Sequence, residues 1–547
     1  MQQKITLRIK PLEALNDAAI RSLIAGNSGT KAEDVTGFHV LKKSIDARSR
    51  QQVWVNLTVQ AFINEPFHKR TIERIALRDV RAARKSAIII GSGPAGLFAA
   101  LELIEQGIKP ILLERGKDVK ARRRDLAALN KEGILNPESN YCYGEGGAGT
   151  YSDGKLYTRS NKRGSIQKAL NIFVQFGAEE KILYESHPHI GTNKLPQIII
   201  AMRAQIIACG GELHFEKRVV DFAIEKSKIK TVQTQDGDNF FADTVILATG
   251  HSARDIFKLL HQKNILIEAK PFALGVRVEH PQQLINQIQY HCSPFTDIHS
   301  EGLAPASYGW VEQVNGRGVF SFCMCPGGII APAATAPGEL VVNGWSPSKR
   351  NNPFANSGIV VEVGLKDAME HFKAFGRETS NMRNPFTSHV SRFTNIIDSP
   401  LILMYFQQHI EQQAFMVGGG KFVAPAARLV DFCDSKTSSS LPDCSYLPGV
   451  IPADMENALP GFVHKTLQEG FKAFGKKMRG YYTNDAIVVA TESRTSSPVR
   501  IPRDADTLVH PQIENLYPCG EGAGYAGGII SAAMDGMNVA AVIANKQ

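Results

Sequence analysis

The sequence predicts an α/β protein whose main domain holds a doubly wound parallel sheet. From Ser86 the pattern runs strand, glycine-rich turn, helix and strand, which is typical of a βαβ unit. Between residues 266 and 480 the chain is richer in Gly, Pro, Asn and aromatic residues and has several β-like runs. Strand, loop and helix patterns return at residues 484–547. We therefore expect a discontinuous main domain with an α+β domain inserted into it.

The first residues predict a small α+β domain of their own. Runs at 5–9, 38–47 and 51–63 alternate as strands do, and residues 12–25 have helical spacing, so a β-hairpin is expected after a helix. Residues 68–85 are strongly basic and predict a solvated linker, helical or irregular. The expected divisions are 1–84 for the small N-terminal domain and linker, 85–265 for the first part of the main domain, 266–480 for the inserted substrate domain, and 481–547 for the second part.

Composition narrows the class of protein and its partners. The 547 residues exceed one ordinary core, and 43% hydrophobic against 21% charged residues is normal for a globular protein. A formal charge of +9 favours anionic ligands, but over this length it does not predict nucleic-acid binding. There is no signal peptide and no apolar run of about 18 residues, so we expect a cytoplasmic protein without a membrane partner. The 8 cysteines form no C-x-x-C pair and are expected to be reduced thiols. The oligomeric state stays open.

The glycine-rich turn carries the clearest chemistry in the chain. The buried-type strand Ala87 to Ile90 runs directly into a G-x-G-x-x-G pattern. Gly91 permits the tight turn, Gly93 lets a pyrophosphate approach the backbone, and Gly96 allows helix and strand to pack closely. The expected phosphate contacts are Gly91, Gly93, Pro94, Ala95 and Gly96.

The elements after this turn complete a Rossmann-like dinucleotide-binding unit. A helix at 97–106 points its positive N-terminal end at the phosphates and stops at Gly107. A strand at 111–113 then ends in Glu114, with Arg115 beside it, where a carboxylate can accept hydrogen bonds from ribose hydroxyls. The unit alone can hold FAD or NAD, and we find no second one in the sequence.

The C-terminus favours FAD. Residues 514–521 form a strand that ends in Gly520 and Glu521, which resembles the second FAD-binding motif of the glutathione-reductase-like flavoproteins. A helix follows whose N-terminus lies at Gly527, Gly528 and Ile529. In those flavoproteins such a helix end faces the flavin ring, where its dipole would stabilise the reduced form.

An ordered set of motifs makes the resemblance more specific. They are KKSIDARSR (42–50), YGEGGAGTYSDGKL (143–156), HPHIGT (187–192), ATGHSARD (248–255), FCMCPGG (322–328), ESRTSSPVRIPRD (492–504) and GEGAGYAGGI (520–529). Together they resemble a poorly characterised family of FAD-dependent dehydrogenases, sometimes labelled NAD(FAD)-utilizing dehydrogenases. The resemblance implies FAD and redox chemistry, with Val219, Thr249 and Gly250 near the cofactor, but it supplies no substrate.

The loop from Gly144 to Lys155 offers backbone N–H groups and a cation beside the expected flavin. The expected contacts are Gly147, Ser152, Gly154 and Lys155, and the alternative is a glycine-rich turn with a solvated lysine. His187, His189 and His251, together with Lys155, are candidates for proton transfer, although structural histidines are more common. No carboxylate or cysteine stands at ligand spacing, so no metal site is expected.

Two pairs of residues are candidates for the substrate side. Cys323 and Cys325 would share one face of a strand, either as a strained redox pair or as two packed thiols near the pocket. Arg494 and Arg500 could clamp a carboxylate or phosphate, and surface ion pairing is the alternative.

The leading hypothesis is an FAD-dependent oxidoreductase, a dehydrogenase or reductase acting on a small and unidentified substrate, for which an anion is one option. NADH or NADPH is considered as a transient electron donor. Two alternatives stay open: a flavin-dependent RNA-modifying enzyme, suggested by the basic linker and the separate first domain, and a non-catalytic FAD-binding scaffold.

Overall fold

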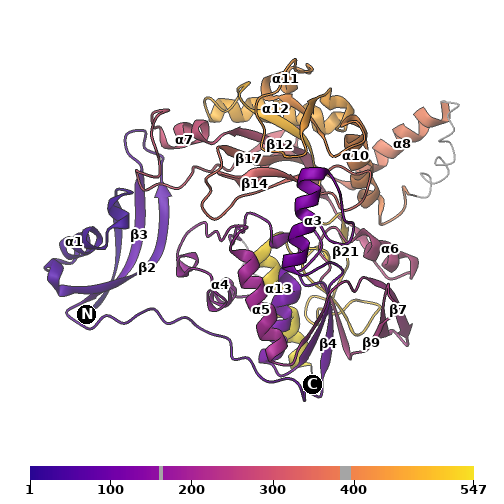
Figure 1. The fold of residues 1–547 in the computed structure, drawn as a ribbon, viewed down its shortest axis with the longest axis horizontal. Coiled ribbons are helices and arrows are strands. Elements are labelled where there is room, and N and C mark those ends of the chain that lie inside the picture. The colour runs from indigo at the N-terminus through magenta and orange to yellow at the C-terminus, as the bar shows by residue number, and fades with distance from the viewer. Residues whose placement is uncertain (159–163, 382–395, 547) are drawn as a thin grey trace.

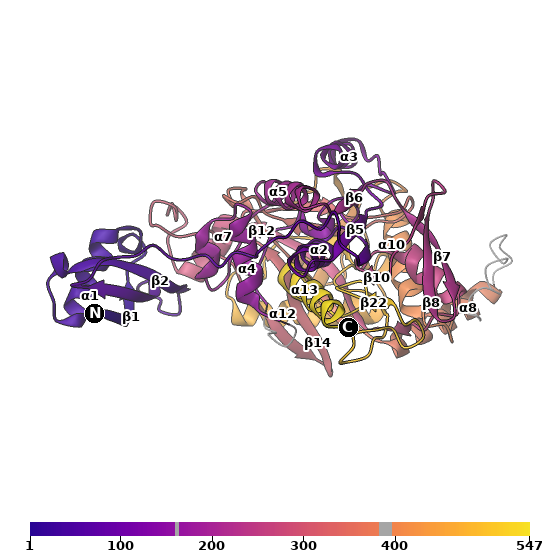
Figure 2. The same ribbon diagram turned by 90° about the horizontal axis from the view of Figure 1, so that it is seen from below.

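The computed structural model describes residues 1–158, 164–381 and 396–546. A small N-terminal domain stands to one side of a larger body, and a long extended segment joins the two (Figure 1). The same separation is visible in the perpendicular view of Figure 2. The larger body is a mixed α/β structure that contains a five-stranded and a seven-stranded sheet. The parallel sheet that the sequence predicts is present.

The N-terminal domain is a three-stranded antiparallel sheet with one long helix. Its strands, in the order β1-β3-β2, are β1 (Gln2–Ile9), β3 (Trp54–Ile63) and β2 (Val35–Asp46), and the helix is α1 (Asp17–Ser28). Alternate side chains of β1 and β3 pack against Ile20 and Ile24 of α1 in a separate apolar core. The predicted hairpin after a helix is therefore found.

The basic segment after this domain forms neither helix nor strand between residues 65 and 80. It is not wholly solvated, because the side chains of Ile75 and Val80 are buried in the core of the larger body. The backbone N–H of Val80 also donates to the carbonyl of Cys209 at 2.7 Å. The linker is thus irregular, which is one of the two predicted forms. Its last part packs against the larger body.

The five-stranded sheet is parallel throughout and positions the glycine-rich turn. Its strands, in spatial order, are β22 (Leu516–Pro518), β10 (Thr244–Leu247), β4 (Ser86–Ile90), β5 (Lys109–Leu113) and β6 (Glu212–His214). Along β4, Ala87 and Ile89 face one core while Ile88 and Ile90 face another, so the strand is buried on both sides. This explains the unbroken apolar run before the turn.

Helices cover one face of this sheet and a second small sheet covers the other. The helices on or near the first face are α2 (Pro94–Glu105), α4 (Ile166–Gln175), α5 (Leu195–Ala208) and α13 (Ile529–Asn545). On the other face lie β7 (Val219–Glu225), β8 (Lys228–Thr234), β9 (Asn239–Phe240) and α6 (Arg254–Gln262). A further helix, α3 (Val119–Glu132), follows β5.

Helices α2 and α13, which are far apart in the sequence, lie side by side on one face of the sheet (Figure 2). Their approach depends on Gly536, because a Cβ there would lie 2.1 Å from the carbonyl oxygen of Ala95. The buried carboxylate of Asp535 accepts two hydrogen bonds from Arg503, at 3.0 and 2.6 Å, and one from the N–H of Gly520, at 2.8 Å. This anchors the chain after β22 to α13.

The seven-stranded sheet forms the second domain. Its order is β13 (Val311–Val314), β14 (Arg317–Cys325), β17 (Phe354–Val363), β12 (Phe272–Pro281), β20 (Ile487–Glu492), β18 (Ala424–Arg428) and β19 (Val450–Pro452). The helices that accompany it are α7 (Gln282–Tyr290), α8 (Leu365–Asn381), α10 (Ile402–Val417), α11 (Leu429–Cys433) and α12 (Gly461–Lys477). Two short pairs, β11 (Glu268–Ala269) with β21 (Val499–Arg500) and β15 (Ile329–Pro332) with β16 (Val342–Trp345), complete the strands.

One strand lies elsewhere than the sequence suggests. We expected the run at residues 486–491 to begin the second part of the main domain. It forms β20 and pairs with β12 and β18 in the seven-stranded sheet. Strands buried on both faces read alike in either sheet, so the apolar pattern could not assign it to one of them. The chain returns to the five-stranded sheet at β22.

None of the helices within the described part of the chain is long and apolar enough to cross a membrane.

We predict that Gly536→Ala lowers the stability of the protein by about 1–3 kcal/mol, because the new methyl group forces α13 away from α2. The control is Gly26→Ala in α1, where nothing lies within 4 Å of a Cβ, and this change should leave the stability unchanged or raise it. Thermal denaturation followed by circular dichroism measures both. Equal midpoints for the two variants would contradict the role of Gly536.

Candidate cofactor and substrate site

A cavity of about 790 Å³ runs from the glycine-rich turn to the seven-stranded sheet. Most residues that the sequence singles out line it. They are Gly91, Gly93, Pro94, Ala95, Glu114, Arg115, Gly147, Ser152, Gly154, Lys155, His187, Val219, Thr249, Gly250, His251, Cys323, Arg494, Glu521, Gly527, Gly528 and Ile529. The remaining five, Gly96, His189, Gly520, Cys325 and Arg500, do not belong to this lining. The fold thus brings residues from many distant segments of the chain to one space.

The glycines of the turn divide into two kinds. A Cβ at Gly91 would lie 2.5 Å from the carbonyl oxygen of Ala248, and one at Gly96 would lie 2.0 Å from that of Gly91. These two positions exclude side chains because the protein itself fills the space. At Gly93 the nearest protein atom would be 3.9 Å away, in Gly147. Gly93 therefore leaves room on the cavity side, as a bound pyrophosphate requires.

Helices α2 and α13 begin at this cavity, and no side chain caps their N-termini. Gly93 precedes α2 and Gly528 precedes α13, and neither offers a side-chain oxygen to the first-turn N–H groups. Free amide donors at the positive end of a helix favour an anion. Because both ends line the same cavity, the residues fit a dinucleotide whose phosphates lie at α2 and whose ring lies toward α13.

Glu114 lines the cavity, but its carboxylate is already engaged. One oxygen accepts hydrogen bonds from the N–H and hydroxyl of Ser92, at 3.0 and 2.8 Å. The other accepts from the N–H groups of Gly116 and Gly144, at 2.9 and 3.0 Å. The hydrogen bonds thus give Glu114 a role that the sequence did not predict, which is to hold the glycine-rich turn against the loop that begins at Gly144.

Arg115 is fixed by two carboxylates and an aromatic ring. Its guanidinium pairs with Glu138 at 2.9 Å and with Asp255 at 3.0 Å, and its Cζ lies 3.9 Å from the ring centroid of Tyr143. Burial opposes the charged form, but Tyr143, Asp255 and Glu138 raise the pKa of Arg115 above its usual value. The residue therefore forms a rigid, charged part of the wall.

A buried polar cluster surrounds Asp153 at the opposite part of the cavity. Its carboxylate lies 3.4 Å from Nζ of Lys155, 3.5 Å from Nε2 of His189 and 3.6 Å from Nη2 of Arg350. Among the described residues neither oxygen of Asp153, nor Nε2 of His189, has a hydrogen-bond partner of good geometry. Burial opposes the charged form, but Lys155, His189 and Arg350 hold the pKa of Asp153 well below its usual range. Unsatisfied polar atoms of this kind indicate a place for a bound polar group.

The two predicted histidines of this region differ in position. His187 lines the cavity and its ring centroid lies 5.0 Å from that of Tyr157. His189 lies behind Asp153, pairs with Lys155 in an isolated bridge and does not line the cavity. Burial lowers the pKa of both imidazoles below the usual value, so both are neutral at pH 7.

Cys142, to which the sequence reasoning gave no role, lies with two predicted residues. Ser252 donates from Oγ to Sγ of Cys142 at 3.4 Å, and the thiol interacts with the imidazole of His251. Nδ1 of His251 lies 3.5 Å from Oε2 of Glu521. All of these side chains line the cavity. No local motif could have shown this, because the three titratable residues come from separate segments of the sequence.

The two cysteines of FCMC do not share a strand face. The chain has a bulge between Phe322 and Cys325, and Cys323 has a φ of 43°, outside the range of a regular strand. Cys323 is exposed to the cavity, Cys325 is fully buried, and both are free thiols. The cavity walls enclose the thiol of Cys323 and shield it from bulk solvent, which raises its pKa to about 12, so it is a neutral thiol at pH 7. The two thiols are therefore not a disulfide, and only Cys323 lines the pocket, whereas Cys325 is packed in the interior.

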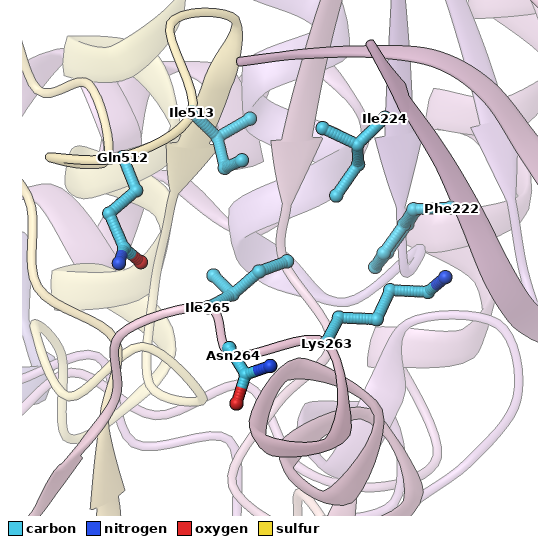
Figure 3. A pocket seen from close by; sticks show the side chains of 7 residues that line it. All are labelled: Phe222, Ile224, Lys263, Asn264, Ile265, Gln512 and Ile513. Atoms are coloured by element: carbon cyan, nitrogen blue, oxygen red, sulfur yellow. The ribbon is translucent and has the colours of Figure 1, made fainter. Parts of the chain in front are cut away.

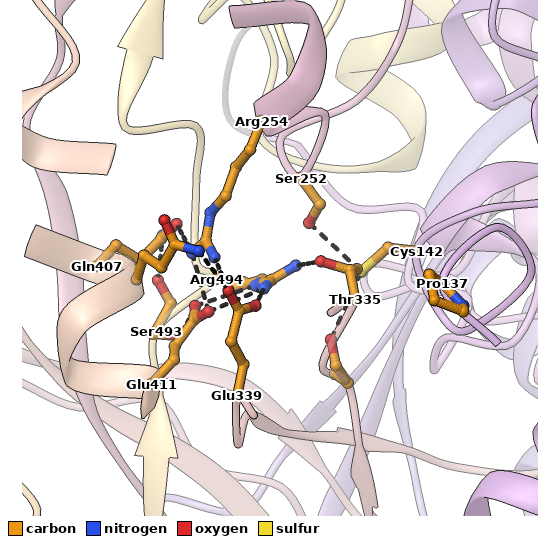
Figure 4. A network of polar contacts seen from close by, with 12 residues as sticks. Pro137, Cys142, Ser252, Arg254, Thr335, Glu339, Gln407, Glu411, Ser493 and Arg494 are labelled. Carbon is orange, nitrogen blue, oxygen red and sulfur yellow. Dashed lines mark hydrogen bonds and ion pairs between the residues drawn. The ribbon is translucent and has the colours of Figure 1, made fainter. Parts of the chain in front are cut away.

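The two arginines proposed as anion clamps lie in other settings. Arg494 belongs to a buried network with Glu411 and Glu339, which it contacts at 2.9 and 3.0 Å (Figure 4). Its charge is already paired, so it is not a free clamp for a substrate anion. Arg500 lies outside the cavity lining, with its Cζ 5.1 Å from the ring centroid of Tyr525. The sequence pattern around Arg494 could not predict this pairing, because Glu339 and Glu411 lie in distant segments of the chain.

A second, smaller hollow of about 370 Å³ lies between β7, the end of α6 and the segment before β22 (Figure 3). Three isoleucines and Phe222 contribute much of its lining, and its one cation, Lys263, pairs with Asp221 at 2.6 Å. It has no catalytic group. Across the described ranges, no group of three or more His, Cys, Asp and Glu side chains could hold a metal ion.

Three family models match the chain. Residues 85–256 match the pyridine nucleotide-disulphide oxidoreductase model, and residues 271–495 match the model for the C-terminal domain of FAD-dependent proteins. Residues 1–62 match a domain of unknown function. The second match includes β20, in agreement with the place of that strand in the seven-stranded sheet.

Solved structures resemble the chain only weakly. CtdE, in a complex with FAD and a substrate, is 10% identical with a TM-score of 0.29, over 84% of this chain and 80% of that one. The tetracycline destructase Tet(51) is 15% identical with a TM-score of 0.26, over 57% of this chain and 66%, just under two thirds, of that one. Because both scores are below 0.5, we build no argument on these likenesses.

A protein of Clostridium beijerinckii, described only as uncharacterized, is 38% identical over 531 residues, which is 94% of this chain and 93% of the relative. The match therefore extends over nearly the whole chain. The chain belongs to the same family as this relative, a family of FAD-dependent proteins with an oxidoreductase-type dinucleotide domain, and FAD is its cofactor.

Proposed function

We propose that the protein is an FAD-dependent oxidoreductase that oxidises or reduces a small substrate in the cavity between its two large sheets. The observation that carries this proposal is the continuity of the cavity. The same cavity is lined by the turn at Gly93, by the N-terminus of α13 at Gly528 and by the polar cluster around Asp153. A cofactor held at the first two places would leave the third for a substrate.

The chain supplies two parts of such a reaction. The uncapped ends of α2 and α13 and the turn at Gly91 would hold FAD, which when bound accepts or donates a hydride. The cluster around Asp153 would orient the substrate, and the neutral imidazole of His189 could hold a proton at Nε2, 3.5 Å from Asp153. His187, on the cavity wall, is a second group for proton transfer.

Charge in this cluster favours an anionic substrate. Lys155 and Arg350 are two cations that face one carboxylate, Asp153, within 3.4 and 3.6 Å. The cluster therefore keeps one unit of positive charge when Asp153 is ionised. A small carboxylate or phosphate would neutralise this charge.

The electron donor is proposed to enter from the substrate side. Among the described residues, only the G-x-G-x-x-G turn at 91–96 lies within a strand–turn–helix–strand unit, and we assign this turn to FAD. NADH or NADPH would then bind transiently in the cavity rather than on a domain of its own. Hydride transfer from a visiting nicotinamide needs no second dinucleotide fold.

Gly93→Ala is expected to lower the affinity for FAD by about tenfold or more, equivalent to about 1.4 kcal/mol, since the methyl group would occupy the space left for the pyrophosphate. The nearest protein atom would be 3.9 Å away, so thermal stability of the FAD-free protein should not change. Fluorescence titration with FAD measures the affinity. Unchanged FAD binding in this variant would contradict the proposed phosphate site.

Anaerobic mixing with NADH or NADPH should bleach the visible absorbance of the bound flavin. The observed rate should rise with nicotinamide concentration without saturating at low concentration, since the donor has no dedicated domain. Stopped-flow absorbance measures this. A flavin that neither nucleotide reduces would contradict the nicotinamide proposal and leave FAD binding intact, and a flavin inert to all reductants would favour the scaffold alternative.

Lys155→Met is expected to weaken binding of a small carboxylate such as benzoate by about tenfold or more, because the anion loses a charge-assisted contact in the cavity. The perturbation of the flavin spectrum on titration with benzoate reports binding. Lys436→Met, at an exposed lysine paired with Asp434, is the matched control and should bind benzoate normally. Equal affinities in both variants would argue against an anion site at Lys155.

A further inference from the structure

The group of Cys142, His251 and Glu521 has the order of a nucleophile, a base and an orienting acid. The imidazole lies between the thiol and the carboxylate, with its Nδ1 3.5 Å from Glu521. The side chain of Glu521 remains 23% exposed, while that of His251 is 11% exposed. All three face the cavity rather than the core. A thiol with a base oriented by a third group is the arrangement that activates a nucleophile.

The surroundings of Cys142 stabilise a negative charge on sulfur. Ser252 donates a hydrogen bond to Sγ at 3.4 Å (Figure 4). The guanidinium of Arg494 adds a favourable charge from the neighbouring network, and it is itself held by Glu411 and Glu339. The other titratable and charged groups that act on this cluster are Arg122, Tyr143 and Lys270.

This setting differs from those of Cys323 and Cys433. Burial raises the pKa of Cys323 to about 12 and that of Cys433 to about 12, so both are neutral thiols at pH 7. Burial also opposes ionisation of Cys142, but His251 and Arg494 outweigh it and lower its pKa to about 7. Burial likewise opposes the charged form of His251, yet Glu521 and Cys142 raise its pKa to about 10. With a pKa of about 7, Cys142 is about half ionised at neutral pH, and its thiolate lies beside an imidazolium.

We propose that Cys142 is a nucleophilic thiolate that adds reversibly to the carbonyl carbon of an aldehyde substrate in this cavity, with His251 as proton donor and Glu521 as the residue that positions the ring. The inference rests on the proposed function for the hydride transfer, because an aldehyde adduct is a compound from which a hydride can be taken. The thiolate itself does not depend on that function.

The addition step balances without any further reagent. The sulfur electron pair forms the S–C bond, and the π pair of the C=O bond moves to oxygen. His251 gives its proton to that oxygen and becomes neutral, which leaves a thiohemiacetal on Cys142. The adduct keeps the C–H bond of the aldehyde, and this is the bond that hydride transfer would break. Reversal of the same steps regenerates the thiolate, the imidazolium and the free aldehyde.

The charge state is tested first, on the full-length protein. Ultraviolet absorbance of thiolate, recorded against pH as the difference between the wild type and Cys142→Ser, should show a step near pH 7. The difference between the wild type and Cys433→Ser, a buried cysteine outside the cavity lining, should lack this step, because burial raises the pKa of Cys433 to about 12. His251→Asn should move the step upward by about one pH unit or more, because the imidazolium is lost. If that variant does not fold, Glu521→Gln is used instead. It removes the carboxylate that positions the imidazole of His251, and it should also move the step upward.

The aldehyde is tested by protection. Iodoacetamide should alkylate Cys142 faster than any other cysteine, as read by peptide mass spectrometry, and propionaldehyde should slow this alkylation at least severalfold until it is removed. A step near pH 9 that His251→Asn leaves in place would overturn the thiolate. Alkylation unaffected by propionaldehyde would overturn the substrate class. Neither readout uses flavin turnover, so a flavin that no donor reduces would count against the proposed function and leave these results standing.

Discussion

The close contact of α2 with α13 is the constraint on which the site depends. The two helices are far apart in the sequence, and each begins after a glycine, which provides no side-chain cap. Because Gly536 has no side chain, the backbone of α13 can contact the backbone of α2 at Ala95. The positive N-termini of both helices therefore reach the same cavity. The buried carboxylate of Asp535, next to that glycine, also fixes Gly520 and hence the segment that carries Glu521. Helix packing, phosphate binding and the placement of Glu521 therefore follow from one short stretch of α13.

A second constraint joins the two large domains. Arg254 begins α6, beside the five-stranded sheet, and its guanidinium contacts Glu339 and Glu411 of the second domain at 3.0 and 2.9 Å. Arg494, just after β20, contacts the same two carboxylates. Buried charges of this kind gain little net stability over apolar packing, but removing one partner leaves the others uncompensated. The network thus fixes the relative position of the domains, and with it the distance between the cofactor end and the polar end of the cavity.

What the sequence could predict was local. The turn at Gly91, the helix after it and the strand at β4 depend on residues that are neighbours in the chain, and each has the form that its pattern predicts. Errors arose where partners are distant. The run at β20 was assigned to the wrong sheet, since a strand buried on both faces has the same pattern in either. Cys323 was placed on a regular strand, whereas a bulge with a φ of 43° turns it into the cavity. The grouping of Cys142 with His251 had no local signal at all.

The small N-terminal domain, which has no cavity residue of its own, still contacts the wall of the site. The edge strand β2 meets the segment before His187: the N–H of Lys43 donates to the carbonyl of Tyr184 at 2.8 Å, and the N–H of Ser186 donates to the carbonyl of Lys43 at 3.0 Å. These are the bonds of a short parallel strand pairing. Since His187 follows Ser186 directly and its ring lines the cavity, the position of the first domain and the position of this histidine are coupled through the backbone. A domain joined by an irregular linker thereby becomes part of the structure that shapes the substrate end of the cavity.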